Sequence, residues 1–165
     1  MTRLLTGLLA LLITGGCGSS ASPVTFSPTF DSKEAAAQAV LDALWTRDAE
    51  RLRGLAVNET EFRKHIWPAL PVAKADVGAT PDYTWAEMSQ KNAASLSGLL
   101  AEHGGRRAVV DQVAFRGSST TYDGFATHAK TELTVSIDGQ SDTMRLFGSM
   151  IESGGRWKIY SYIVD

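Results

Sequence analysis

The chain has one cysteine and three histidines in 165 residues, and Arg106-Arg107 is its only adjacent arginine pair. A single cysteine excludes an internal disulfide framework and a metal site built from several cysteines. The histidines, His65, His103 and His128, lie far apart in the sequence and form no metal-binding motif. A formal net charge of −2 without a basic stripe argues against binding to nucleic acid.

Motifs that bind phosphate, activate a serine or hold zinc are also missing from the sequence. It contains no glycine-rich phosphate loop, no G-x-S-x-G turn and no H-E-x-x-H helix. The sequence therefore predicts no cofactor and no metal. What it does contain is a targeting signal followed by enough residues for one domain.

The first residues have the three parts of a secretory signal. Met1-Thr2-Arg3 carries the positive charge, Leu4 to Ile13 is apolar but too short to span a bilayer, and Thr14-Gly15-Gly16 is a small-residue cleavage site. Cys17 follows directly. The alternative is an ordinary secreted protein in which a cysteine lies near the cleavage site by chance.

The segment Leu12 to Cys17 resembles the lipobox of bacterial lipoproteins, with Thr14 where that family usually has leucine. The resemblance implies that residues 1–16 are a signal peptide and that Cys17 carries acyl chains such as palmitate. It also implies export and attachment to the membrane through that lipid, on the periplasmic face or outer membrane of a bacterium with two membranes. Residues 17–30 are rich in Ser, Pro, Thr and Ala, which predicts a flexible tether, and residues 31–165 are expected to form one domain.

The first half of that domain has helical periodicity. Asp31 and Glu34 have the spacing of a capping box, and a helical face follows, comprising Ala36, Ala37, Val40, Leu41, Leu44 and Trp45. Asp48 and Asn58 are expected to cap two short helices, of which the second carries Phe62 and Ile66 inward. Pro68 to Pro81 is expected to be a loop, and a longer helix is expected from Thr80-Pro81 or Thr84 to Gly104-Gly105, with Asn92 on its apolar stripe, either hydrogen-bonded in the core or facing a cavity.

From Arg106 onward the period becomes two. The pattern predicts a first strand near Val109, a long strand from Phe125 to Ile137, a strand from Thr143 to Ile151 and a last strand from Trp157 to Val164. Asp138-Gly139 and Ser153-Gly154-Gly155 mark the turns. Helices followed by strands indicate the α+β class, with N-terminal helices packed on a curved antiparallel sheet of about four strands.

This order, with the final Gly154-Gly155-Arg156-Trp157-Lys158-Ile159 strand, resembles the nuclear-transport-factor-2-like superfamily, in which helices pack into a curved sheet to make a cone. The resemblance covers roughly Ser32 to Asp165. It implies a cavity between the helices and the sheet. That superfamily includes isomerases, dehydratases, cyclases and non-catalytic binding domains, so the fold does not select a function.

Aromatic side chains are the candidates for lining that cavity. They are Trp45, Phe62, His65, Trp67, Tyr83 and Trp85. Trp67 can either rim the mouth of the cavity or plug the end of the cone. If helices cover the Trp157 face of the last strand, Tyr160 and Tyr162, with Phe147, form an outer patch suited to a homodimer or a protein partner. His128 alternates onto the expected wet face of its strand.

Three functions remain open from the sequence. The first is a membrane-tethered, non-catalytic binding or interaction domain that accepts an apolar small ligand. The second is a small acid–base enzyme of the isomerase or dehydratase type, with His65 or Asp82 in the cavity. The third is a purely structural envelope lipoprotein. The first is favoured because Asp and Glu residues in the strand half fall at turns and expected wet positions.

Overall fold

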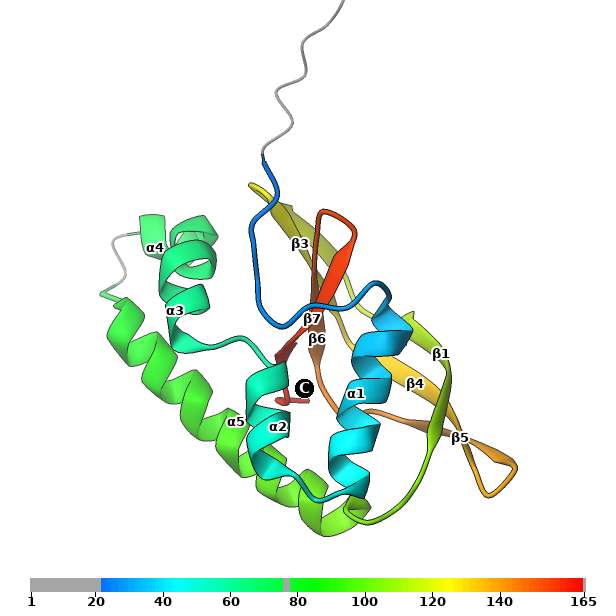
Figure 1. Cartoon of the computed structure of the whole chain (residues 1–165). Helices are drawn as coiled ribbons and strands as arrows, with labels where there is room; N and C mark the ends of the chain where they lie inside the picture. Colours follow the sequence, from blue (N-terminus) through cyan, green and yellow to red (C-terminus); the bar gives the residue numbers. More distant parts are fainter. Residues whose placement is uncertain (1–21, 76–77, 165) are drawn as a thin grey trace, which may run out of the picture.

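The structure is a computed structural model that describes residues 22–75 and 78–164. Cys17 and the signal peptide lie outside these residues. Helices come first: α1 (Lys33–Trp45), α2 (Ala49–Leu55), α3 (Glu59–Glu61), a π-helical turn (Phe62–Ile66), a 3₁₀ turn (Trp67–Ala69), α4 (Pro71–Lys74) and α5 (Pro81–His103). Strands follow: β1 (Val109–Phe115), β2 (Ser119–Tyr122), β3 (Phe125–Ala129), β4 (Thr131–Ile137), β5 (Gln140–Met144), β6 (Ser149–Ser153) and β7 (Arg156–Ser161). The α+β class is confirmed (Figure 1).

Side-chain caps start most of the helices where the sequence predicts them. Asp48 accepts from Arg51 N at 2.9 Å, and Asn58 and Glu61 form a capping box. The cap of α1 was predicted one residue too early. Ser32 accepts from Ala35 N at 3.0 Å, because Asp31 forms an ion pair with Arg156 instead. No helix in the described residues is both long and apolar enough to cross a membrane.

The strands form two antiparallel sheets, with orders β1-β4-β5 and β2-β3-β6-β7. The prediction of one sheet of about four strands is wrong in count. The chain bends three times to pass from one sheet to the other, where β1 leads to β2, β3 to β4 and β5 to β6, whereas the last expected strand stays in one sheet as β7. Backbone hydrogen bonds continue across the bends, for example from Thr131 N to Gly148 O at 3.0 Å. The four expected strand segments are therefore present, but they curve more sharply than expected.

Two bends break strands that the sequence pattern joins. Lys130 has φ of 55° and separates β3 from β4, although Thr131, Leu133 and Val135 keep the buried phase. Arg145 to Gly148 separates β5 from β6, and a Cβ on Gly148 would lie 2.0 Å from Ile163 O. Only glycine allows that close approach between the two backbones. Both hairpin turns are confirmed, since Asp138, Gly139, Gly154 and Gly155 all have positive φ.

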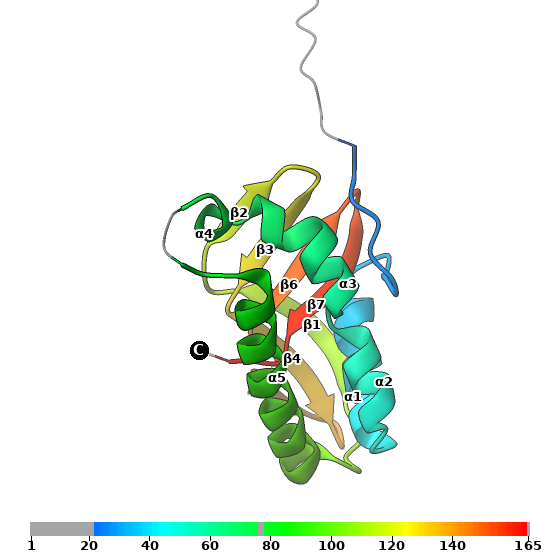
Figure 2. The same cartoon turned by 90° about the vertical axis from the view of Figure 1, so that its left-hand side faces the viewer.

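Both faces of the β2-β3-β6-β7 sheet are covered. On one face Met150 and Ile159 join a core with α1, α2 and the other sheet; on the opposite face Phe125 and Ile151 join a second core with Phe26, Phe62 and Ile66. Figure 2 shows α3 and the start of α5 on the near side of this sheet and α1 with α2 to one side. Alternation along β3 or β7 therefore does not separate core from solvent.

The chain before α1 is part of the fold. Phe26 is buried, Val24 N donates to Gly124 O at 3.1 Å, and Phe30 bridges to Trp157. Lys158 Nζ donates to Ser27 O at 2.8 Å. The domain thus begins near Val24, earlier than the predicted boundary at Asp31, because aromatic residues spaced by four give this segment apolar contacts that its composition does not reveal.

Candidate functional site

The aromatic candidates do not converge on one cavity. Phe62, Trp67 and Trp85 do pack together, with Phe62 5.4 Å from Trp85 and 6.1 Å from Trp67 between ring centroids. Trp45 lies elsewhere, 46% exposed, with the Arg107 guanidinium 5.0 Å from its ring centroid. Tyr83 is 68% exposed. Trp45 was expected on the buried face of α1, but it is exposed at the end of the helix although its neighbours Ala43 and Leu44 are buried.

The two candidates for acid–base chemistry, His65 and Asp82, also do not lie together, and each contacts a different partner. His65 packs edge-on against Phe26, with 5.9 Å between the rings, and burial lowers its pKa. Asp82 is exposed and forms an ion pair with Arg63. With Lys64, His65 borders two pockets of about 490 and 510 Å³, larger than the two cavities described below, neither of which it lines.

The expected outer patch near Tyr160 and Tyr162 is not formed. Tyr162 and Phe147 are fully buried, and the Tyr162 hydroxyl donates to Leu52 O at 2.7 Å. β7 ends at Ser161, so Tyr162 no longer follows the alternation that places Tyr160 on the opposite face. Asn92 Oδ1 accepts from Tyr162 N at 2.6 Å, and Asn92 also borders a cavity, so both interpretations of this polar residue on the α5 stripe hold.

His128 was predicted to be solvated and is instead held in an aromatic stack. Its ring lies 4.7 Å from the Phe115 ring and 5.1 Å from the Trp157 ring. Nδ1 is 2.8 Å from Ser119 Oγ, whereas Nε2 is buried and has no hydrogen-bond partner among the described residues. Burial lowers the pKa of this imidazole. The prediction failed because both faces of its sheet are covered.

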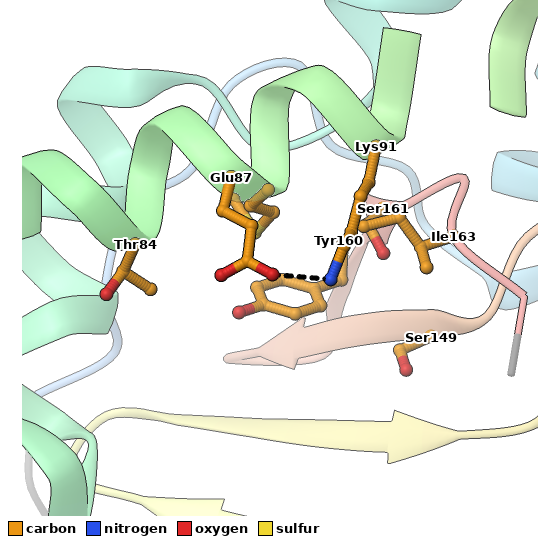
Figure 3. Close-up of a pocket in the computed structure, with 8 residues that line it drawn as sticks. Thr84, Glu87, Lys91, Ser149, Tyr160, Ser161 and Ile163 are labelled. Carbon is orange, nitrogen blue, oxygen red and sulfur yellow. Dashed lines mark hydrogen bonds and ion pairs between the residues drawn. The ribbon is translucent and has the colours of Figure 1, made fainter. Parts of the chain in front are cut away.

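A cavity of about 310 Å³ lies between α5 and the strands β6 and β7 (Figure 3). Four hydroxyl-bearing side chains line it, together with an ion pair and two apolar residues: Thr84, Ser149, Tyr160, Ser161, Glu87, Lys91, Met88 and Ile163. α5 supplies one wall because Thr84, Met88 and Lys91 are four and three residues apart and so share a helix face. β6 and β7 supply the other wall.

The groups in this cavity favour hydrogen bonding over proton transfer. Burial raises the pKa of Tyr160 to about 12, so its hydroxyl stays protonated and acts as a donor at neutral pH. Glu87 Oε1 is 2.6 Å from Lys91 Nζ, and Figure 3 shows this pair lying over the Tyr160 ring. The charges therefore largely neutralise each other at the rim, and the hydroxyls provide both donors and acceptors inside.

A second cavity, of about 240 Å³, lies on the other side of α5, toward α2 and α3. Its lining includes the apolar residues Val57, Trp85, Met88 and Leu96. Met88 borders both cavities. Of the aromatic residues predicted to line a site, Trp85 is thus the one that borders an α5 cavity.

Most of the residues around the first cavity were not singled out from the sequence. Tyr160 was assigned to an outer face, and Thr84, Ser149 and Ser161 carried no signal as isolated hydroxyls. The spacing of Thr84, Met88 and Lys91 along α5 was the one available sign of a shared face. In the residues that the structure describes, no group of three or more His, Cys, Asp or Glu side chains is placed to hold a metal ion.

Comparison of the chain with family models, curated proteins and solved structures finds no match.

Proposed function

We propose that the protein is a lipid-anchored component of the bacterial cell envelope whose domain binds a small polar molecule in the cavity between α5 and β7. The observation that carries the proposal is the lining of that cavity. Hydroxyl-bearing side chains from α5, β6 and β7 line one concave site, and two charged groups in its lining, Glu87 and Lys91, are paired. A few convergent polar groups in a concavity are typical of small-molecule sites.

Binding without transformation is supported by the titratable groups of the cavity. A general base needs a pKa near the working pH and a free lone pair aimed at the substrate. Tyr160 has a pKa raised to about 12, and the Glu87 carboxylate is in an ion pair with Lys91. Neither side chain suits the role of the base that the enzyme alternative requires.

The anchor in this proposal is the lipid on Cys17. Packing of the chain begins at Val24, so few residues separate the acylated cysteine from the domain. At about 3.3–3.6 Å per residue, the segment from Cys17 to Val24 reaches at most about 25 Å. The domain would therefore be held close to the bilayer surface. Helices followed by four antiparallel strand segments, of which three bend between two sheets, support placing this domain with the nuclear-transport-factor-2-like cones.

The binding site is tested by filling the cavity. The mature chain, residues 17–165 with Cys17→Ser to avoid detergent, is mixed with the small-molecule fraction of an envelope extract and examined by native mass spectrometry. We expect bound molecules on this protein and on Ala86→Trp, where Ala86 is an exposed α5 residue that lines neither cavity. Thr84→Trp should lose them. Equal retention by both variants, or no retention by any form, contradicts the proposal.

A further inference from the structure

We propose that the two cavities beside α5 form one binding site for an amphiphile, with an uncharged, hydroxyl-rich headgroup on the Tyr160 side and a short alkyl chain on the Trp85 side. This inference rests on the proposed function, because it names the class of molecule that the α5 cavity takes. It follows from the position of Met88, from the contrast between the two linings and from the volumes.

Met88 is the partition between the two cavities. Thr84, Glu87 and Lys91 border the first cavity and Trp85, Ser89 and Asn92 border the second, while Met88 borders both. On a helix of 3.6 residues per turn, position 88 lies between these two faces. Methionine is unbranched and has three rotatable side-chain bonds, so it can change rotamer at little cost. Such a change would join the cavities beneath the helix.

Half-buried side chains make most of the contacts that hold α5 to the domain. Of its 23 residues, all within the described part of the chain, Leu96 alone is fully buried. The helix runs along one side of the molecule, next to α2 and α3 at one edge and to β7 at the other (Figures 1 and 2). Ten other residues of α5 are half-buried, and of these Trp85 and Met88 pack against the second core, so the connection requires a change in the Met88 side chain.

The two sides of the joined site differ in chemistry. On the first side four hydroxyls face the cavity, and the ion pair of Glu87 with Lys91 at 2.6 Å leaves little net charge to select an ionic group. On the second side Val57, Trp85 and Leu96 provide an apolar wall. Paired donors and acceptors suit a sugar or glycerol headgroup, and apolar side chains suit methylene groups.

The polar groups that border the second cavity are already paired with protein atoms. Arg53 pairs with Glu50 at 3.0 Å, Glu59 pairs with Arg63 at 2.6 Å, and Asn92 Oδ1 accepts from Tyr162 N. A polar ligand would have to compete with these partners, whereas an alkyl chain would not. The occupant that this side fits is therefore a hydrocarbon chain.

The volumes also favour one joined site. The cavities measure about 310 and 240 Å³, which places them at or below the lower end of the usual range. Joined, they would offer about 550 Å³, within the roughly 300–1,000 Å³ typical of small-molecule sites. A headgroup the size of one sugar with a short chain would use both halves.

The test compares two probes that share a headgroup, octyl glucoside below its micelle concentration and methyl glucoside. Each is titrated calorimetrically into the mature chain with Cys17→Ser. We expect octyl glucoside to bind at least tenfold more tightly, because several methylenes leave water, each worth about 0.8 kcal/mol when fully buried. Ala93→Phe, which places a ring at the lining of the second cavity, should abolish that difference. Ala94→Phe is the matched control, since the neighbouring exposed alanine lines neither cavity.

The outcomes separate this inference from the proposed function. If methyl glucoside binds as tightly as octyl glucoside and Thr84→Trp abolishes both, the polar cavity is a site and the joined site is wrong. If Ala93→Phe and Ala94→Phe weaken octyl glucoside equally, the chain does not enter the second cavity and the inference is again wrong. If neither probe binds, the amphiphile assignment fails, whereas the extract experiment decides on its own whether the cavity binds another molecule.

Discussion

Two charged side chains, Glu61 and Lys158, are buried together in the described part of the chain. Their charged atoms lie 3.5 Å apart, and Glu61 also accepts from Ser27 N at 2.7 Å and Asn58 N at 3.0 Å. Lys158 donates to Ser27 O, and burial lowers its pKa against the opposing effect of Glu61. This pair connects β7, α3 and the segment that enters the domain from the N-terminus.

Removing the charge of Glu61 should therefore destabilise the fold strongly. Glu61→Gln leaves Lys158 charged and buried without its counterion, and breaking such a pair costs about 3–5 kcal/mol of unfolding free energy. Glu59→Gln is the control on the same helix, because its pair with Arg63 is exposed and such pairs contribute about 0–1 kcal/mol. Urea unfolding of both variants measures the two losses of unfolding free energy. Similar values would show that the buried pair contributes no more to stability than the exposed pair.

The stacked imidazole of His128 should make stability depend on pH. Its pKa is lowered from 6.5 in the folded chain by burial, so the unfolded chain binds more protons below about pH 6.5. The folded state therefore loses stability relative to the unfolded state as the pH falls from 6.5 toward the lowered pKa of His128 in the folded chain. His128→Phe keeps a ring between Phe115 and Trp157, and it should lose less unfolding free energy between pH 7 and pH 5 than the unsubstituted chain. Identical pH dependence in urea titrations of the two proteins would contradict this.

At the scale of elements, the helices were more predictable than the strands. Asp48, Asn58 and Thr80 are caps whose side chains bond within three residues, so local sequence is sufficient to place them. The bend at Lys130 has no such local sign, since a lysine with positive φ is set by the pairing of its neighbours in two sheets. The polar strand β2 was missed for a related reason, because its Ser and Thr residues lack an apolar face.

The buried phase of β4 is the part of the strand pattern that the structure confirms, and it gives a third prediction. Leu133 is fully buried between Val113 on β1 and Met144 on β5, and Val135 is buried on the same face. Leu133→Ala should cost about 2–5 kcal/mol through lost burial and an unfilled cavity. Glu132→Ala, which removes an ion pair to exposed Arg116, should cost about 1 kcal/mol or less. Thermal or urea unfolding showing the reverse order would place this strand one residue out of register.

The site was less predictable than the fold because it depends on how α5 lies against β7. Trp85 and Met88 could be assigned to an apolar helix face from spacing alone, but which side of that face stays unfilled is decided by distant residues such as Ser149 and Ser161. Tyr162 shows the same limit: one residue beyond the end of a strand, its direction is fixed by Asn92 and Leu52 and not by alternation.

At the scale of the whole molecule, the segment before α1 is bound to the domain close to the point where a lipid on Cys17 would attach it to a membrane. Val24 bonds to the turn between β2 and β3, and Ser27 is held by Lys158 and Glu61, so the chain is fixed to the domain within a few residues of the segment that precedes it. Figure 1 shows the first described residues, in blue, at one end of the molecule, beside the tips of β3 and β7. That end should face the bilayer, with the α5 cavities to the side.

The anchor itself is the last prediction. If Cys17 is acylated, the processed protein should require detergent for extraction and its N-terminal residue should carry the mass of the acyl chains, since each buried methylene contributes about 0.8 kcal/mol and two or more chains give stable attachment. Cys17→Ser should remove the added mass and the detergent requirement, while Ser20→Ala, in the same segment, should change neither. Mass spectrometry of the N-terminus distinguishes a lipid from a retained signal peptide, because the two differ in sequence before residue 17. An unmodified Cys17 in the processed protein, or unchanged membrane fractionation of Cys17→Ser with residues 1–16 removed, would exclude the lipoprotein assignment and leave the cavity as a property of a secreted domain.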